Sequence, residues 1–129
     1  MKPIRFAEDV LSALEGTKGL RIRAGTGRHR FIGIWFVVVE GQVVVRSWSI
    51  KPTGWYRKFL RKPRGAIKLG KSEIAVRAIP VRSKDLRDAV DQAYLERYNT
   101  GGELKYAKDL CQAKSRATTT ELIPLQKPD

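Results

Sequence analysis

Short runs of alternating or continuous apolar residues fill the middle of the chain and predict a fold rich in β-strands. Leu20 to Ala24 reads Leu, Arg, Ile, Arg, Ala, which predicts a strand with one buried face. Two β-branched and aromatic runs, 31–39 and 43–48, flank Glu40-Gly41-Gln42 and predict a hairpin whose first strand is buried on both faces. The predicted strands are 20–24, 31–39, 43–48, 65–69, 72–81 and 118–125.

Apolar residues at helical spacing predict helices before, between and after these strands. The segment 54–62 places Trp55 and Phe59 on one inward face, with Thr53 as its N-cap. Ser83 caps a longer helix that begins at Lys84. The predicted helices are 6–15, 54–62, 84–98 and, with a weaker pattern, 103–114.

This order of elements predicts an α+β fold. Tight hairpins disfavour a parallel doubly wound sheet, and six short, mostly antiparallel strands interrupted by helices favour a small barrel. A chain of 129 residues has the size of one domain and can bury a core without disulfides or metals. We therefore expect a single domain over 1–129, with a free tail at 127–129.

The charge is strongly positive and unevenly distributed. The chain has 26 Lys and Arg against 13 Asp and Glu, a formal net charge of +13. Residues 16–72 contain 14 of those cations and a single acid, Glu40. A basic protein of this kind attracts nucleic acid, anionic lipid and phosphorylated small molecules. We expect the binding surface in the first half of the chain.

Composition also excludes several classes of site. With one cysteine, Cys111, and one histidine, His29, the chain has no intrachain disulfide and no expected transition-metal site. No Ser-His-Asp or Cys-His arrangement is visible. Asp85, Asp88 and Asp91 are spaced by three, and we expect them to serve the helix dipole and a solvated face rather than a metal.

No apolar run approaches the roughly 18 residues that a membrane-spanning helix needs. The N-terminal segment has acids where a secretory signal needs an apolar core. We expect a cytoplasmic protein without a membrane partner.

Two basic segments are candidates for an anion site. Residues 23–30 combine Gly25 and Gly27 with arginines, a composition suited to a phosphate cradle, although a solvated basic turn is an equally common outcome. Residues 44–69 contain eight Lys or Arg and no acid. Trp48, Trp55 and Tyr56 lie in that second segment, so its rings could cover the flat face of a ligand whose phosphates the cations hold.

These segments resemble the flavin-binding split β-barrel superfamily, in particular its deazaflavin-dependent nitroreductase-like branch. The chain is most similar to a bacterial family of small uncharacterised proteins placed near that branch. The resemblance rests on the basic Gly turn that runs into Phe31 to Val37, on Gly41 to Trp48, and on Pro52-Thr53-Gly54-Trp55-Tyr56 with Pro63. It covers roughly residues 20–98. Two positions depart from the pattern: Lys58 stands where the branch usually has Asn, and Ser47-Trp48-Ser49-Ile50 replaces a Ser-x-Gly-Gly turn.

The resemblance implies a six-stranded, mostly antiparallel split β-barrel with flanking helices. It also implies an FMN or deazaflavin cofactor, held by its phosphates near the first turn and by its ring near the second. Tyr56 is the candidate proton donor. The candidate cofactor-binding residues are Arg23, Thr26, Arg28, Arg30, Ser47, Trp48, Lys51, Trp55 and Arg57.

Two functions fit these observations. The first is an oxidoreductase that transfers a hydride from a reduced flavin or deazaflavin to a small organic substrate, where the cofactor supplies the chemistry. The second is a binding module without turnover, for a phosphorylated cofactor or for nucleic acid. The chain lacks helix-turn-helix, zinc-finger and ribonucleoprotein-type motifs, which disfavours nucleic acid. Pairing of two copies is common in the superfamily, and a homodimer is the expected assembly.

Overall fold

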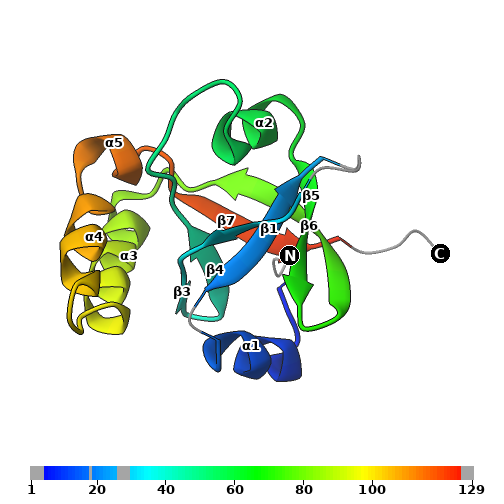
Figure 1. Cartoon of the computed structure of the whole chain (residues 1–129), viewed down its shortest axis with the longest axis horizontal. Helices are drawn as coiled ribbons and strands as arrows, with labels where there is room; N and C mark the ends of the chain where they lie inside the picture. Colours follow the sequence, from blue (N-terminus) through cyan, green and yellow to red (C-terminus); the bar gives the residue numbers. More distant parts are fainter. Residues whose placement is uncertain (1–4, 18, 26–29, 126–129) are drawn as a thin grey trace.

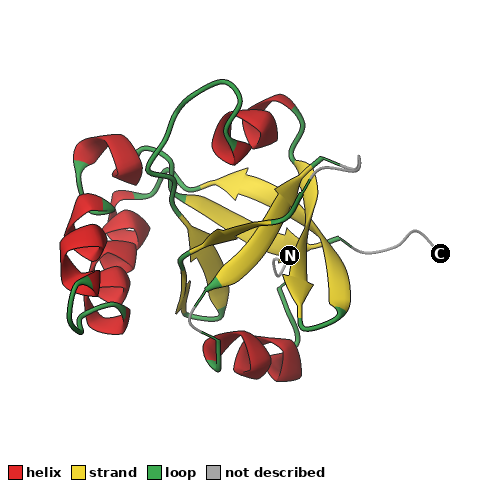
Figure 2. Ribbon diagram, in the orientation of Figure 1, coloured by secondary structure: helices red, strands yellow, loops and turns green. Residues whose placement is uncertain are grey.

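One antiparallel sheet curls into a nearly closed barrel, with helices over both of its ends and along one side (Figure 1, Figure 2). The structure, a computed structural model, describes residues 5–17, 19–25 and 30–125. Its elements are α1 (Glu8–Glu15), β1 (Leu20–Ala24), β2 (Ile32–Ile34), β3 (Phe36–Val39), β4 (Gln42–Val45), α2 (Trp55–Arg61), β5 (Arg64–Leu69), β6 (Ser72–Pro80), α3 (Lys84–Arg97), α4 (Glu103–Asp109), α5 (Ala113–Arg116) and β7 (Thr120–Pro124).

The described residues form seven strands, in the order β2-β1-β5-β6-β7-β4-β3, so the predicted count of six was wrong. The predicted strand 31–39 is two strands, one at each end of this order, joined through Trp35. The reason is that the hydroxyls of Tyr94 on α3 and of Tyr98, its C-cap residue, bond the backbone there in place of a neighbouring strand. The Tyr98 hydroxyl accepts from the Phe36 N–H at 3.1 Å and donates to the Phe36 carbonyl at 2.8 Å. The Tyr94 hydroxyl donates to the Trp35 carbonyl at 3.0 Å. The chain thus crosses from one end of the sheet to the other and nearly closes the barrel.

Two hydrophobic cores stabilise the fold. Inside the barrel, fully buried side chains from opposite strands meet, among them Ile22, Phe36 and Ile67. Outside it, Val37 and Val44 pack against α3 and the segment that follows it. Because alternate residues of a strand point to opposite faces, β3 and β4 supply both cores, and this explains their continuous apolar runs.

Helix α2 covers one end of the barrel, opposite α1 (Figure 1). Trp55 and Phe59 face inward and are 8% and 3% exposed, which confirms their predicted orientation. Their close approach requires Gly65 on β5, where a Cβ would lie 2.2 Å from the Arg23 carbonyl oxygen and 2.9 Å from the Phe59 ring. The predicted N-cap, Thr53, was wrong: Gly54 occupies that position and no side chain caps the helix.

The remaining helices follow the predicted pattern with differences at their ends. Ser83 caps α3 by accepting the Leu86 N–H at 3.2 Å, as predicted. The predicted helix 6–15 begins only at Glu8, because the chain is still extended at Ala7. The predicted helix 103–114 is two short helices, α4 and α5, separated at 110–112.

Candidate functional site

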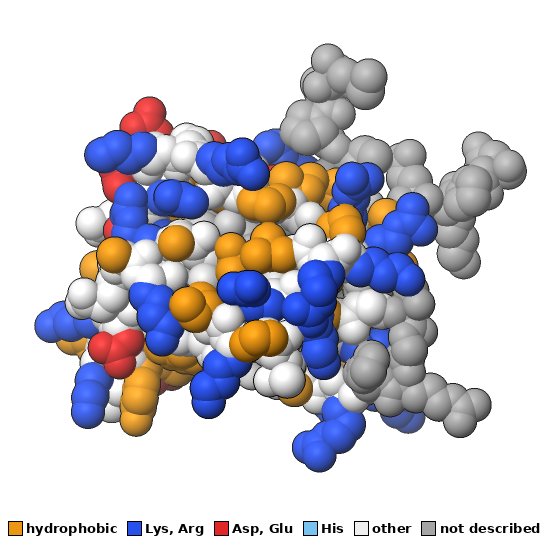
Figure 3. All heavy atoms as spheres, turned by 90° about the horizontal axis from the view of Figure 1, so that it is seen from above, with side chains coloured by type: hydrophobic (Ala, Val, Ile, Leu, Met, Phe, Trp, Pro, Cys, Tyr) orange, Lys and Arg blue, Asp and Glu red, His pale blue; other side chains and the backbone are white. Residues whose placement is uncertain are grey.

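The two basic segments meet at a cavity of about 360 Å³ beside α2. Strands β1 and β2 form one wall, and the loop from Arg46 to Gly54 with the start of α2 forms the other. Seen from the α2 end of the barrel (Figure 3), Lys and Arg side chains surround a group of hydrophobic ones, while the acidic side chains visible there lie toward α3–α5. We call this space the first cavity. Its lining residues are Ile22, Arg23, Ala24, Arg30, Ile32, Gly33, Ile34, Arg46, Ser47, Trp48, Ser49, Thr53, Gly54, Trp55 and Lys58.

Cations without carboxylate partners give the first cavity its charge. Arg30 and Lys58 line it, and neither side chain forms a hydrogen bond or ion pair within the described part of the chain. No Asp or Glu is among the described lining residues. A concave wall of this kind attracts an anion and strengthens its binding by partly excluding water.

Arg23 is held in place but keeps one donor unused. Its guanidinium carbon lies 4.6 Å from the centre of the Phe31 ring, and its Nη2 lies 3.6 Å from Oε2 of Glu73. Its Nε is buried and has no hydrogen-bond partner among the described residues. A buried cationic N–H without an acceptor is costly, so this atom is suited to a phosphate oxygen.

Indole rings border the cavity at the loop and at the helix. Trp55 is nearly buried and meets Phe59 edge to face at 6.0 Å. Trp48 is 41% exposed, and its ring contacts Trp35 at 5.7 Å and Tyr106 at 6.4 Å. Trp48 therefore belongs to an aromatic cluster on the barrel exterior and presents only part of its surface to the cavity.

Ser47 lines the cavity with a hydroxyl that is already engaged. Its Oγ donates to the Ser49 carbonyl at 2.6 Å and accepts the Ser49 N–H at 3.1 Å. Its own N–H donates to Oγ1 of Thr118 at 2.8 Å. These bonds shape the loop, so the role of Ser47 here is chiefly to position the backbone, with one lone pair left for a ligand.

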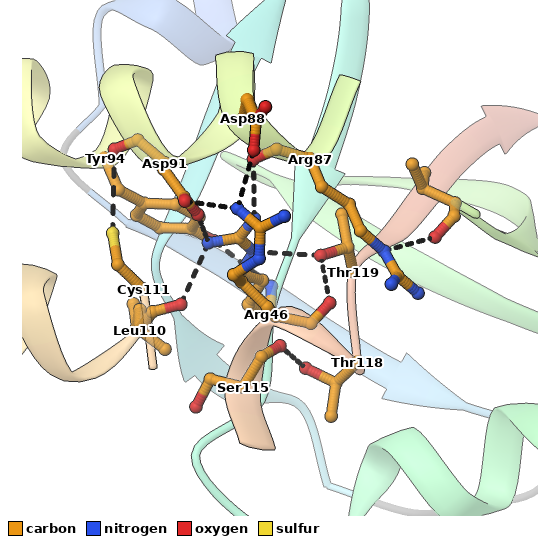
Figure 4. A network of polar contacts seen from close by, with 12 residues as sticks. Arg46, Arg87, Asp88, Asp91, Tyr94, Leu110, Cys111, Ser115, Thr118 and Thr119 are labelled. Carbon is orange, nitrogen blue, oxygen red and sulfur yellow. Dashed lines mark hydrogen bonds and ion pairs between the residues drawn. The ribbon is translucent and has the colours of Figure 1, made fainter. Parts of the chain in front are cut away.

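Arg46 anchors the same loop from the opposite side (Figure 4). Its side chain is fully buried, and Nη1 lies 2.5 Å from Oδ1 of Asp91 on α3. Further bonds run from Nη1 to the Leu110 carbonyl, from Nη2 to the Arg87 carbonyl and from Nε to Oγ1 of Thr119, all at 2.9 Å. Every nitrogen of its guanidinium is bonded within the protein, so not all of the eight cations counted in residues 44–69 are available to a ligand.

The acids of α3 are not merely a solvated face, as the sequence suggested. Asp91 pairs with Arg46 and also with Arg116 of α5. Asp88 pairs with Lys84 and Arg116, both at 3.0 Å. Hydrogen bonds from Lys84 and then Arg116 lower the pKa of Asp88 below its usual value. These pairs connect α3, α5 and the loop of the first cavity.

The structure brings five of the predicted residues to one cavity: Arg23, Arg30, Ser47, Trp48 and Trp55. Thr26 and Arg28 lie outside the described residues. Lys51 and Arg57 are exposed and do not line the first cavity. Tyr56 lies on the far side of α2, where it lines a second cavity and its hydroxyl faces the Ala117 carbonyl at 3.4 Å. The role of Tyr56 as proton donor stays a prediction.

Lys58, Thr53 and Ile32 are among the lining residues of the first cavity that sequence reasoning overlooked. Helical spacing could have found Lys58, since it lies three residues after Trp55 and so shares its face. Ile32 and Thr53 carry no such signal. Among the described residues, no three His, Cys, Asp or Glu side chains are placed to hold a metal ion, and no helix is long and apolar enough to cross a bilayer.

Together, the barrel and its basic, indole-bordered cavity define an α+β protein of the split β-barrel class. Solved structures share this fold over most of the chain. Their sequence identity to this chain is low, so the likeness shows the fold alone. A candidate pyridoxamine 5′-phosphate oxidase of Listeria innocua is 13% identical, with 92% of this chain and 93% of that one covered and a TM-score of 0.63. The heme storage protein HutZ of Vibrio cholerae is 16% identical, with 96% and 93% covered and a TM-score of 0.65.

A conserved hypothetical protein of Mycobacterium tuberculosis is 15% identical, with 98% and 83% covered and a TM-score of 0.54. At the level of sequence, residues 11–122 match the model of the family described as uncharacterized protein conserved in bacteria, DUF2255. The chain belongs to that family. Among proteins with curated descriptions, none matches the sequence.

Proposed function

We propose that the protein binds a flavin nucleotide, FMN or a deazaflavin, in the first cavity and acts as an oxidoreductase on a small organic substrate. One observation carries this proposal: the cations of two distant segments line a single cavity together with two indoles. The unused Nε–H of Arg23 fits a phosphate oxygen. Structural neighbours described as an oxidase of a phosphorylated pyridoxamine and as a heme storage protein support a cofactor-binding role for the fold.

The roles of the lining residues follow from their chemistry. Arg23, Arg30 and Lys58 would hold phosphate, because charge-assisted hydrogen bonds are the strongest available here. Trp55, fixed by its packing on Phe59, would cover one face of a flat ring. A flavin or deazaflavin, when bound, supplies the hydride transfer. The protein then has only to bind, to orient and to keep water from the reacting face.

The test is a titration of purified protein with FMN and with the deazaflavin, followed by fluorescence quenching at moderate salt. We expect saturable binding of one molecule per chain and a loss of about tenfold or more in affinity for Arg30→Ala and for Lys58→Ala. Arg57→Ala is the matched control, because it removes a neighbouring exposed cation that does not line the cavity. Equal losses in all three variants would mean that only net charge attracts the nucleotide.

A carrier without turnover is the second candidate. It is favoured by a specific observation: no His, Cys, Tyr, Asp or Glu is among the described lining residues, so Lys58 is the one described titratable side chain there besides the arginines. Reduced flavin bound without oxidation by nitroaromatic or quinone substrates would support the carrier. Retention on heparin together with no response to either flavin would instead support a nucleic-acid partner.

We also propose that two copies pair through the face beside the first cavity. Ile32 and Trp48 line the first cavity, and Ile50 follows in the same loop; these residues are 42%, 41% and 46% exposed. Apolar side chains grouped at a cavity mouth are typical of a protein interface. Light scattering on a size-exclusion column measures the assembly, and Ile50→Glu should shift a dimer toward the monomer. A monomer at micromolar concentration in the unsubstituted protein would refute the pairing.

A further inference from the structure

A second cavity, of about 270 Å³, lies on the other side of α2, against the ends of β6 and β7. None of the described residues lines both this cavity and the first one. Its wall is mostly apolar and includes Phe59, Leu60, Pro63, Ile79 and Pro80. Leu60 and Ile79 are 50% and 37% exposed, so apolar side chains border an opening to solvent without being covered by the described part of the chain.

Among the described residues that line this cavity there is one cation, Arg77. Its side chain is exposed and forms no hydrogen bond or ion pair with any described residue. Directly opposite it on the neighbouring strand is Arg64, whose side chain is also exposed and likewise forms no such bond with a described residue. Like charges that face each other across a strand pair destabilise a sheet.

The described acids nearest along these strands do not relieve this repulsion. Glu73 of β6 lies near Arg23, at 3.6 Å, and Glu121 of β7 accepts from Nε2 of Gln42 at 3.0 Å. An anion between the two arginines would relieve it. The site is thus an apolar pocket with a cationic edge, a combination that selects a ligand with one negative group and an apolar body.

We propose that the second cavity binds a small carboxylate with an aromatic ring, its ring among the apolar side chains and its carboxylate at Arg77. The size fits, because an apolar cavity of roughly 150 Å³ already accepts benzene. The remaining volume accommodates a short chain that leads from the ring to the carboxylate. Arginine is suited to this partner, since its planar guanidinium can donate two parallel hydrogen bonds to a carboxylate.

This proposal does not depend on flavin binding. The two cavities are nevertheless neighbours, because Phe59 lines the second one and its ring meets Trp55 of the first at 6.0 Å. Because no described residue lines both cavities, backbone amides on either side of α2 can report which cavity a ligand enters.

The experiment is a titration of ¹⁵N-labelled full-length protein with 3-phenylpropionate at millimolar concentrations, observed by two-dimensional NMR. We expect the amides of Leu60, Ala78 and Thr120 to shift, and those of Gly33 and Ser49 in the first cavity to stay. Arg77→Met should weaken binding about tenfold or more, as expected from losing charge-assisted bonds. Arg82→Met, which removes an exposed arginine just beyond β6 that does not line the cavity, should bind like the unsubstituted protein.

Two further measurements keep the proposal falsifiable. Leu60→Glu places a negative charge at the mouth of the cavity, where it should repel the carboxylate of 3-phenylpropionate and weaken its binding. The position is exposed on the helix, so the protein should stay folded. The uncharged 3-phenylpropanol should bind more weakly than the acid. The proposal is overturned if the shifted amides belong to the first cavity, if Arg77→Met and Arg82→Met behave alike, or if the alcohol binds as well as the acid.

Discussion

Asp91→Asn should destabilise the protein more than any other single loss of a charge on α3. The Arg46 side chain is 0% exposed, and Asp91 is its counter-ion at 2.5 Å. Removing one partner of a buried ion pair costs about 3–5 kcal/mol, because the other charge stays buried and unpaired. Asp91 itself is 21% exposed and asparagine keeps one acceptor oxygen, so we expect about 3 kcal/mol, at the lower end of that range. For a chain of this length this corresponds to a fall in Tm of roughly 10–15 °C.

Urea unfolding, with the free energy extrapolated to water, measures this loss. Asp88→Asn is the matched control: it removes the same charge from the same helix, but its side chain is 47% exposed, and an ion pair that solvent screens contributes little to stability. A double-mutant cycle with Arg46→Met should show that the two losses are not additive. If Asp91→Asn and Asp88→Asn lower the free energy of unfolding equally, the buried pair does not hold the loop, and the argument fails.

Three other outcomes follow from the structure. Gly65→Ala should lower the free energy of unfolding by about 3 kcal/mol or prevent folding, since the new Cβ would overlap backbone and ring atoms. Gly33→Ala, with no atom within 4 Å of the new Cβ, should have little effect, and thermal unfolding compares the two variants. The pKa of Asp88 is lowered in the folded state, so its contribution to stability is complete above the pKa of the unfolded chain and is lost as the pH falls through the folded value. Urea midpoints of Asp88→Asn and the unsubstituted protein should therefore converge below about pH 4, and parallel curves would contradict this. Tyr56→Phe should leave flavin affinity unchanged, because the side chain lines the second cavity; if Tyr56 donates the proton, the turnover rate alone falls.

Much of the fold could be predicted because local patterns and tertiary packing agree. The α+β class, the hairpins and the inward face of α2 are confirmed, and the period of apolar residues was sufficient for each. The division of 31–39 was missed because its cause lies in Tyr94 and Tyr98, about sixty residues away. A continuous apolar run does not show where a distant hydroxyl will replace a strand partner.

The kinds of residue that form the first cavity could be predicted from the sequence, but which individual residues line it could be predicted only in part. Clustered cations and indoles pointed to Arg23, Arg30 and Trp55, which line one cavity. Charge alone could not show that Arg46 is buried while neighbouring cations are exposed. The residues that bond its side chain lie far along the chain, and the local sequence does not indicate them. Trp55 and Tyr56 could be placed on different faces by helical spacing, but not assigned to different cavities.

The bonds of Arg46 also bear on when the first cavity can form. Every described residue that lines this cavity lies between positions 22 and 58, whereas the described partners of the Arg46 side chain lie between 87 and 119. A fragment that ended after β6 would thus carry all of the described lining residues and still lack the support for its loop. During synthesis, the loop would reach its final shape only after the C-terminal third has left the ribosome.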